Sequence, residues 1–330
     1  MPALLLTHRC NERYGTALVA AAAAHGITLE PVALPADPAA RLDPEQCGRI
    51  ALALFSRDAF PDFSRQFYSA AFKAGRLKWL HVFNAGTDHP IFGQLLERGV
   101  RLTTSSGASA EPVALTALTG MLMLARGFPR WIAAQGKRAW EPVLGDAVPP
   151  DLRGQTALLV GVGAIGRVLA RAARSLGVRV LGVRRSARAP DDPVDEMHSP
   201  AALDGLLPRA QWLVLTCPLT EETHRLIDAR RLALLPRGAC LINVARGEIV
   251  EEPALIEALA QGRLAGAYLD VFEQEPLPAA SPLWTLPNVI VSPHNAAASA
   301  GHDARVHEIF LHNLPLWARG EPMRNEVFGK

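Results

Sequence analysis

Several features that would commit a chain to a special environment are missing from this 330-residue sequence. It has only four cysteines, Cys10, Cys47, Cys217 and Cys240. They are scattered and form no C-x-x-C pair, which argues against a disulfide framework and predicts a reduced, cytoplasmic setting. No stretch reaches the ~18 continuous apolar residues of a membrane-spanning helix. The apolar start follows no basic segment, so it is typical of a first strand and not of a signal peptide.

A surplus of charge of one sign is also missing. The 34 basic residues almost balance the 32 acidic ones, so no bulk field would attract nucleic acid or an anionic membrane. Lysine is scarce, with four residues among the 34 basic ones, which we attribute to genome composition. His302, His307 and His312 are five residues apart, a spacing that spreads them around a helix. No metal site is therefore predicted.

Short apolar segments alternate with helical ones along the whole chain, which is the pattern of an α/β protein with parallel sheets. The strands expected in the first part of the chain are residues 4–7, 50–55, 79–83 and 101–104. Those expected later are residues 156–160, 179–183, 212–215, 239–243, 266–269 and 289–291. The later strands are almost continuously apolar, as expected where helices cover both faces of a sheet.

Helical patterns are expected between these strands, at residues 14–25, 66–74, 111–125 and 166–176. A continuation of the third helix around residues 131–140 should be broken by Pro129 and Gly136. Residues 141–150 contain three prolines and predict an extended connector.

A glycine-rich loop, Gly161-Val162-Gly163-Ala164-Ile165-Gly166, follows an apolar strand and opens a helix. Its first glycine permits a tight turn, the second lets the backbone approach a pyrophosphate, and the third lets helix and strand pack closely. The free N–H groups of the helix N-terminus would then bind the phosphates. Glycine-rich turns are common, but the strand before this one and the helix and strand after it favour a dinucleotide-binding site.

The place where an NAD-binding acid would stand holds Arg184, followed by Arg185 and Ser186. A guanidinium can bind the 2′-phosphate of NADP, which a carboxylate would repel. Two arginines in a loop could also be ordinary solvated charges. We interpret the pattern as a preference for NADP, with NAD possible.

Three polar residues, Arg246, Glu275 and His294, stand where later apolar strands end. Ligands of open α/β sheets bind beyond the carboxyl ends of the strands. Taken alone, each could be a surface arginine, a solvated glutamate or a turn histidine. Together they fit the reduction of a 2-keto acid: Arg246 would bind the carboxylate and polarise the carbonyl, and His294 would donate a proton to the alkoxide. Glu275 would orient the imidazole and favour its protonated form.

These motifs resemble those of the D-isomer-specific 2-hydroxyacid dehydrogenases. The likeness runs from Asp151-Leu152-Arg153-Gly154 and the glycine loop, through residues 218–223 and 243–247, to Ser292-Pro293-His294. It implies that Arg246, Glu275 and His294 are the family's catalytic residues. It also implies further cofactor contacts, at Cys217, Pro218, Thr223, Val244, Ala245 and Asp270. Cys217 by itself is more typical of packing than of a nucleophile.

The resemblance also implies a fold, which is a Rossmann-type doubly wound cofactor domain at residues 107–298 and a flavodoxin-like substrate domain at residues 1–106 and 299–330. Asn84-Ala85-Gly86-Thr87-Asp88 is similar to the family's Gly-Ala-Gly-Val-Asp loop, whose backbone would bind the substrate carboxylate. Asn84 replaces a usual glycine. Residues 131–140 lie where the family contacts a second subunit, so a homodimer is expected.

The ending Arg184-Arg185-Ser186 is similar to that of NADPH-using glyoxylate and hydroxypyruvate reductases, so the expected substrate is a small 2-keto acid of that type. Other functions of the same fold stay open. Formate dehydrogenases share the Arg/His pair but carry Gln where this chain has Glu275, whereas phosphite dehydrogenases keep all three residues. A non-enzymatic, nucleotide-gated corepressor is the alternative of a different class.

Overall fold

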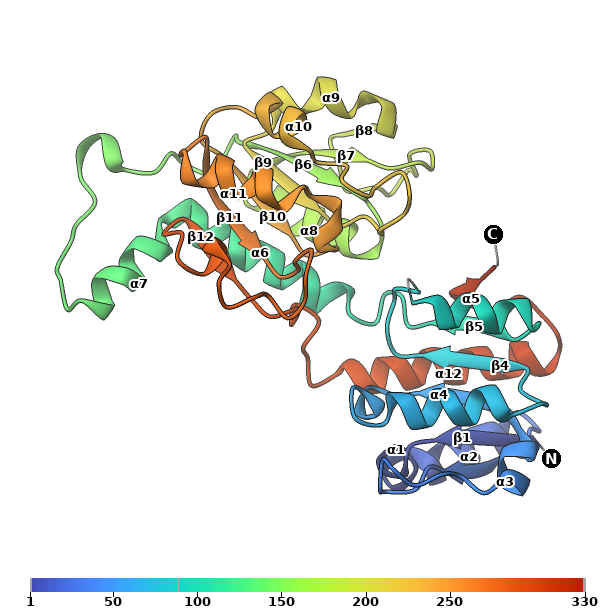
Figure 1. The fold of residues 1–330 in the computed structure, drawn as a ribbon. Helices are drawn as coiled ribbons and strands as arrows, with labels where there is room; N and C mark the ends of the chain where they lie inside the picture. Colours follow the sequence, from blue (N-terminus) through green and yellow to red (C-terminus); the bar gives the residue numbers. More distant parts are fainter. Residues whose placement is uncertain (1, 88, 329–330) are drawn as a thin grey trace. The chain divides into compact units, whose positions relative to one another are not determined.

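Figure 1 shows the computed structural model of the protein, which describes residues 2–87 and 89–328. The chain divides into two compact units. Unit 1 comprises residues 1–108 and 299–330, and unit 2 comprises residues 109–298. Each unit has its own sheet with helices on both faces. The predicted fold class, two α/β units on mainly parallel sheets, is confirmed.

Unit 1 has a six-stranded sheet in the order β13-β5-β4-β3-β1-β2. The strands are β1 (Ala3–Leu6), β2 (Glu30–Ala33), β3 (Ile50–Phe55), β4 (Trp79–Val82), β5 (Arg101–Thr104) and β13 (Glu326–Val327). Strands β1 to β5 are parallel in the flavodoxin-like order 2-1-3-4-5, and β13 adds antiparallel to β5. The carboxyl ends of the parallel strands therefore share one edge, which includes the loop after β4.

Helices cover both faces of this sheet. They are α1 (His8–Cys10), α2 (Thr16–Ala24), α3 (Pro44–Arg49), α4 (Ser64–Lys73), α5 (Pro90–Glu97) and α12 (His302–Ala318). On one face Phe67 of α4 packs in a core with Leu80 and Leu102. On the other face Phe310 of α12 stacks on Trp79, with ring centroids 4.8 Å apart. Because both faces are buried, the strand residues are apolar at nearly every position.

Unit 2 has a seven-stranded sheet in the order β12-β11-β10-β9-β6-β7-β8, all parallel. The strands are β6 (Thr156–Val160), β7 (Arg179–Val183), β8 (Glu196–His198), β9 (Trp212–Leu215), β10 (Ala239–Asn243), β11 (Leu264–Leu269) and β12 (Val289–Val291). The order reverses between β6 and β9, which is the place where doubly wound sheets bind their ligands.

The helices of unit 2 are α6 (Ala110–Arg126), α7 (Phe128–Gly136), α8 (Ala164–Ser175), α9 (Leu203–Leu206), α10 (Ala229–Leu234) and α11 (Glu252–Ala260). The break between α6 and α7 falls at Gly127, whose φ of 75° ends the first helix. Pro129 lies in the first turn of α7, where a proline is tolerated. The prediction is wrong for Pro129, which starts a helix and does not interrupt one, but it is confirmed for Gly136, where α7 ends.

Helix α6 lies very close to β11. A Cβ at Gly120 would come within 2.3 Å of the Tyr268 ring, so only glycine allows this approach. Leu159 of β6 and Ala170 of α8 complete the core on this face. No helix in the described parts of the chain is long and apolar enough to cross a membrane.

Three strands were not predicted, and all three lie at sheet edges. Strand β2 contains Pro31, which cannot donate to a ladder and so weakens the sequence signal. Strand β8 is only half-buried, and β13 has two residues. The predicted strands match the observed ones closely, although β11 begins at Leu264 and not at residue 266.

Candidate active site

The glycine loop joins β6 to α8 in unit 2, as predicted. Gly161 has φ of 102°, and a Cβ there would come within 2.5 Å of the Cys217 backbone nitrogen. A Cβ at Gly166 would come within 2.3 Å of the Gly161 carbonyl oxygen. By contrast, a Cβ at Gly163, the N-cap of α8, would meet no described atom within 4 Å. Two glycines thus close the turn, and the middle one leaves open space at the helix N-terminus, which fits a dinucleotide pyrophosphate.

Arg184 follows β7 and is held by a carboxylate. Its Nη1 and Nη2 donate to Asp192 Oδ1 and Oδ2 at 2.9 and 2.6 Å. Arg167 of α8 pairs with the same carboxylate. The Arg184 side chain is 16% exposed and that of Asp192 is fully buried. Burial by itself would raise the pKa of Asp192, but the Ala189 N–H and the two guanidinium groups lower it overall.

The next two predicted residues, Arg185 and Ser186, are exposed. Their side chains leave the loop toward solvent, whereas the guanidinium of Arg184 also donates to the carbonyl oxygens of Val162 and Ser186. The loop after β7 is therefore shaped from inside by Arg184, and its outer surface presents the second arginine.

The loops after β9 and β10 hold five other predicted cofactor residues. Cys217 is buried, and burial raises the pKa of its thiol to about 11, which keeps it protonated and unreactive. Thr223 Oγ1 accepts from the Thr220 N–H and donates to the Pro218 carbonyl, both at 2.7 Å. Val244 and Ala245 are buried directly after β10. These residues form an ordered, mostly apolar boundary near the carboxyl ends of the central strands.

Arg246 stands at the end of β10, and the loop around it is tightly fixed. Asn243 Nδ2 donates to the Arg246 carbonyl at 2.9 Å, and Asn243 Oδ1 accepts from the Ala245 N–H at 3.0 Å. A Cβ at Gly247 would come within 1.8 Å of the Phe272 carbonyl carbon. Glycine at this position therefore lets the loop after β10 touch the loop after β11, which carries Glu275.

Glu275 and His294 form a hydrogen-bonded pair. His294 Nδ1 lies 2.7 Å from Glu275 Oε2, and Glu275 Oε1 accepts from the Phe272 N–H at 3.1 Å. Burial by itself would raise the pKa of Glu275, but the His294 bond, the Phe272 N–H and the charge of Arg246 together lower it. The three residues are thus close enough to interact, and Glu275 is an anion at neutral pH.

The loop of His294 is anchored by a buried carboxylate. Asp270 follows β11 and is 2% exposed. Its Oδ1 accepts from Ser292 Oγ at 2.6 Å and from the Asn295 N–H at 2.9 Å, and its Oδ2 accepts from the Ala296 N–H at 2.9 Å. The Asp270 carbonyl also accepts from the His294 N–H at 2.8 Å. These bonds hold His294 in the left-handed region, at φ of 52°.

The predicted substrate loop belongs to unit 1, where it follows β4. The Asn84 carbonyl accepts from the Ser105 N–H at 3.1 Å, and its side-chain amide donates to the Gly86 carbonyl. Among the described residues, nothing accepts from the backbone N–H groups of Ala85 and Gly86. Asp88 lies outside the described residues.

Residues 118–296 match the family model described as "D-isomer specific 2-hydroxyacid dehydrogenase, NAD binding domain". The chain belongs to the D-isomer specific 2-hydroxyacid dehydrogenase family. A glyoxylate reductase of Korarchaeum cryptofilum is 35% identical over 258 residues, which are 77% of each chain. Another, of Thermofilum pendens, is 35% identical over 254 residues, which are 75% of this chain and 74% of that one.

Solved structures agree with this membership. A D-isomer specific 2-hydroxyacid dehydrogenase family protein of Aeromonas salmonicida has a TM-score of 0.81 and 32% identity over 99% of this chain and 98% of that one. A dehydrogenase of the family from Xanthobacter autotrophicus, in complex with NADPH and MES, has a TM-score of 0.76 and 32% identity over 99% and 97%. The enzyme is therefore an oxidoreductase with a nicotinamide-binding Rossmann unit that acts on 2-hydroxy or 2-keto acids. The predicted family and the predicted enzymatic activity are confirmed.

Three contributors to the site were not predicted from the sequence. Asp192 binds Arg184, Gly247 lets two loops meet, and Asn243 fixes the backbone of Arg246. A sequence signal existed only for Asn243 and Gly247, which flank Arg246 in the motif. Asp270 was expected to bind cofactor, and its role in holding the His294 loop was not foreseen.

Proposed function

We propose that the enzyme reduces a small 2-keto acid, glyoxylate or hydroxypyruvate, to the D-2-hydroxy acid, with NADPH as its preferred cofactor. The observation that carries this proposal is the His294–Glu275 hydrogen bond, with the charge of Arg246 acting on the same carboxylate. The glyoxylate reductases among its relatives support the choice of substrate. When bound, the reduced nicotinamide supplies the hydride.

The roles of the three residues follow from their chemistry. Arg246 binds the substrate carboxylate and polarises the C2 carbonyl, because a guanidinium fork offers parallel N–H donors. Hydride addition at C2 makes an alkoxide, which takes a proton from His294 Nε2, since Nδ1 is bonded to Glu275. Glu275 stays charged, so it holds the ring orientation and favours the imidazolium that donates the proton.

The two units have separate tasks in this proposal. Unit 2 binds the cofactor. Unit 1 supplies the loop Asn84-Ala85-Gly86, and the N–H groups of Ala85 and Gly86, which have no acceptor among the described residues, bind the substrate carboxylate. The Asn84 side chain closes back on Gly86 and so holds the loop in a turn.

The cofactor preference rests on the loop after β7. Residues 184–186, which stand where an NAD-binding acid would be, include no carboxylate that would repel a 2′-phosphate. The expectation from the sequence put Arg184 first and Arg185 and Ser186 as helpers. Because Asp192 occupies both outer nitrogens of Arg184, we propose that Arg185 and Ser186 contact the phosphate and that Arg184 positions their loop. An NADPH complex among the structural neighbours supports the choice of cofactor.

The experiment that tests the reaction is the His294→Ala variant. Turnover of glyoxylate and hydroxypyruvate should fall by ~10²–10⁴, the usual contribution of general acid catalysis. Binding of NADPH, measured by fluorescence, should persist. His312→Ala, a change at an exposed histidine of α12, is the matched control and should leave both unchanged. If His294→Ala keeps most of its kcat, the assignment is wrong.

The substrate is tested with a panel of 2-keto acids, formate and phosphite, each with both cofactors. Highest kcat/KM for glyoxylate or hydroxypyruvate would support the proposal. Oxidation of phosphite with no reduction of any keto acid would replace it with the phosphite dehydrogenase alternative.

We also propose a homodimer in the cytoplasm. Large apolar side chains are exposed along one stretch of unit 2, and they are Leu115, Phe128, Trp131, Ile132, Trp140, Leu144 and Val148. Trp140 is 96% exposed, which is unusual for an indole and fits burial against a second copy. The double variant Trp131→Glu/Ile132→Glu should sediment as a monomer, and a wild-type monomer would refute the dimer. The cytoplasmic location is a separate part of the proposal. All four cysteines are free, which supports a reducing compartment.

A further inference from the structure

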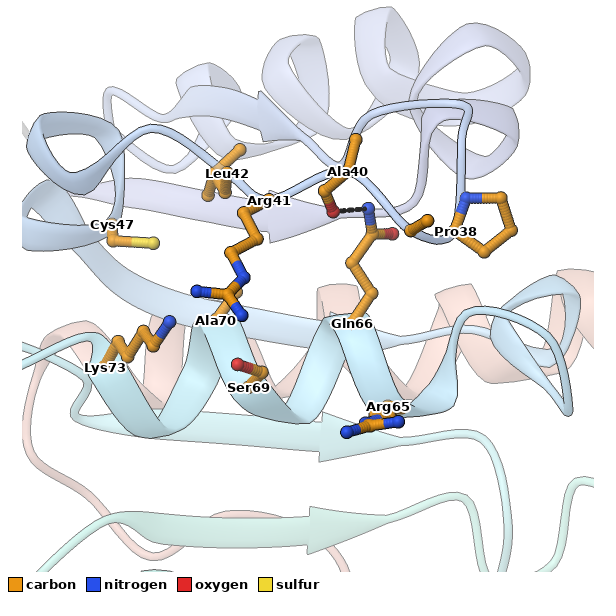
Figure 2. Close-up of a pocket in the computed structure, with 11 residues that line it drawn as sticks. Pro38, Ala40, Arg41, Leu42, Cys47, Arg65, Gln66, Ser69, Ala70 and Lys73 are labelled. Carbon is orange, nitrogen blue, oxygen red and sulfur yellow. Dashed lines mark hydrogen bonds between the residues drawn. The ribbon is translucent and has the colours of Figure 1, made fainter.

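Unit 1 contains a cavity of about 400 Å³ that no part of the proposed reaction uses (Figure 2). It lies between α4 and the loop that leads to α3. Its lining comes from residues 38–42, Cys47, Arg65, Gln66 and the last turns of α4. The volume is within the range of small-molecule sites. We propose that this cavity is a second binding site, specific for a small phosphomonoester that also carries a hydroxyl group.

The charge of the cavity is the first argument. Arg65, Ser69 and Lys73 lie at i, i+4 and i+8 on one face of α4, and Arg41 reaches over this face from the loop (Figure 2). No acidic side chain of the described residues forms an ion pair with Arg41, Arg65 or Lys73. Three cations and no anion therefore line the same space.

The two acidic residues that flank the cavity loop in the sequence, Asp37 and Asp43, accept hydrogen bonds from backbone groups. Asp37 Oδ1 accepts from the Ala39 N–H at 2.9 Å. Asp43 caps α3 and accepts from the Glu45 and Gln46 N–H groups at 2.8 and 3.3 Å. Both carboxylates thus bond to backbone N–H groups and not to the guanidinium or ammonium groups of the cavity, whose N–H donors stay available to an external anion. A phosphate dianion suits such a site, because guanidinium groups bind its oxygens through paired N–H donors and an ammonium group adds a point charge.

The second argument is an unused polar atom in the wall. Gln66 is only 9% exposed, and its Nε2 donates to the Asp37 and Ala40 carbonyls at 3.0 and 2.7 Å. These two bonds fix which end of the amide is the oxygen. Its Oε1 is buried and accepts from no described group. A buried acceptor without a donor costs free energy, so a ligand hydroxyl that donates to Oε1 would be selected along with the phosphate.

This site is separate from the proposed active site. None of the residues that line the cavity belongs to the glycine loop, the Arg246–Glu275–His294 group or the Asn84 loop. A suitable probe is sn-glycerol 3-phosphate, which has a phosphate and two hydroxyls but neither the carboxylate nor the keto group of a substrate. Absence of binding by this probe would therefore refute the second site without counting against the proposed reaction.

The test is calorimetric titration of the full chain with this probe. We expect saturable binding at one site per chain that weakens with salt. Each removed cation should weaken binding roughly tenfold, so Arg41→Ala/Lys73→Ala should bind about a hundredfold more weakly. Arg76→Ala removes an exposed charge outside the cavity and is the matched control. Both variants change exposed side chains, and thermal unfolding checks that they fold.

Other variants separate the alternatives. Arg185→Ala and Arg246→Ala should bind the probe as the wild type does, because those arginines serve cofactor and substrate. Methyl phosphate, which has no hydroxyl, should bind roughly two- to tenfold more weakly than glycerol 3-phosphate. Equal binding of both compounds would overturn the role of Gln66. No saturable binding to the wild type, or equal binding by Arg41→Ala/Lys73→Ala, would overturn the site.

Discussion

Two loops of unit 2 are each built around one buried aspartate, but the partners differ. Asp270 accepts from a hydroxyl and two backbone N–H groups, so its charge meets neutral donors only. Asp192 accepts from the Ala189 N–H and from two guanidinium groups. The first loop carries His294, and the second carries the arginines that we assign to the cofactor. Neutral donors thus fix the first loop, whereas the second loop is fixed by arginines, which are also the side chains that bind phosphate.

The largest effect in this comparison should come from Asp270→Ala. It leaves two N–H groups and one hydroxyl without an acceptor, each costing about 1–3 kcal/mol when buried. Part of the loop can relax into solvent, so we expect about 3 kcal/mol less free energy of unfolding by denaturant titration. Turnover should fall by ~10² or more, because His294 loses its orientation.

The matched control for this prediction is Asp228→Ala. Asp228 caps α10 by accepting from the Arg231 N–H at 2.8 Å. Its loss should cost about 1 kcal/mol of stability and leave turnover unchanged. If Asp270→Ala turned over like the control, Asp270 would not be what positions His294.

A smaller loss is expected from Asp192→Ala. Removing one partner of a buried ion pair costs ~3–5 kcal/mol, and partial exposure of the arginines reduces this to about 2 kcal/mol. Asp191→Ala is the control, since that carboxylate is 77% exposed although it also binds Arg167. Denaturant unfolding should show almost no change for the control. Equal losses in the two variants would mean that burial of Asp192 is unimportant.

The ion pair of Asp192 with Arg184 also predicts that stability depends on pH. The folded-state pKa of Asp192 is lowered from 3.8. Its contribution to stability is therefore complete above about pH 4 and is lost as the pH falls through the lower, folded value. The difference in unfolding free energy between wild type and Asp192→Ala should be constant at neutral pH and shrink in acid. A difference that grew in acid would have the wrong sign.

A variant in the loop after β7 should change the preference for NADPH over NADH by about tenfold. Arg185→Ala should lower kcat/KM for NADPH roughly tenfold and leave that for NADH unchanged, as expected for one partly exposed charged contact. Arg184→Ala should reduce the preference less and destabilise the fold through Asp192. The reverse order would mean that Arg184 leaves Asp192 and binds the phosphate itself. In that case Arg184→Asp should favour NADH.

The smallest effect belongs to Glu275→Gln. It removes the negative charge beside His294 but keeps a hydrogen-bond acceptor. The limb of the reductive pH profile should move toward acid, and only slightly, since both side chains are partly exposed. The measurement is kcat/KM for one keto acid against pH. A limb that stayed in place would show that Glu275 does not act on His294.

The comparison also shows which parts of the structure can be predicted from the sequence. The glycine loop was predictable because strand, turn and helix are contiguous and each glycine has a local reason. The group Arg246, Glu275 and His294 was predicted because parallel strands bring their carboxyl ends to one edge, and the hydrogen bond between Glu275 and His294 agrees with it. Strands β2, β8 and β13 were not predicted, because these edge strands are short or half-buried.

The pairing of Arg184 with Asp192 could not be predicted in the same way. The two residues are eight apart in an irregular loop, where spacing fixes no geometry. An arginine after a strand looks equally suited to a phosphate and to a nearby carboxylate. For Asp270 the partners lie 22 to 26 residues later, and only the sheet brings them together.

The close approach of α6 and β11 has a mechanical consequence. The Tyr268 ring fills the notch at Gly120, and its hydroxyl lies 2.6 Å from Ser292 Oγ, which in turn donates to Asp270. The ring thus acts as a rigid spacer between the helix and the segment that bears His294. Helix α6 also presents exposed Leu115 on the surface that we assign to a second copy. We therefore expect pressure on that surface to be transmitted, through the Tyr268 phenol and the Ser292 hydroxyl, to the loop of His294.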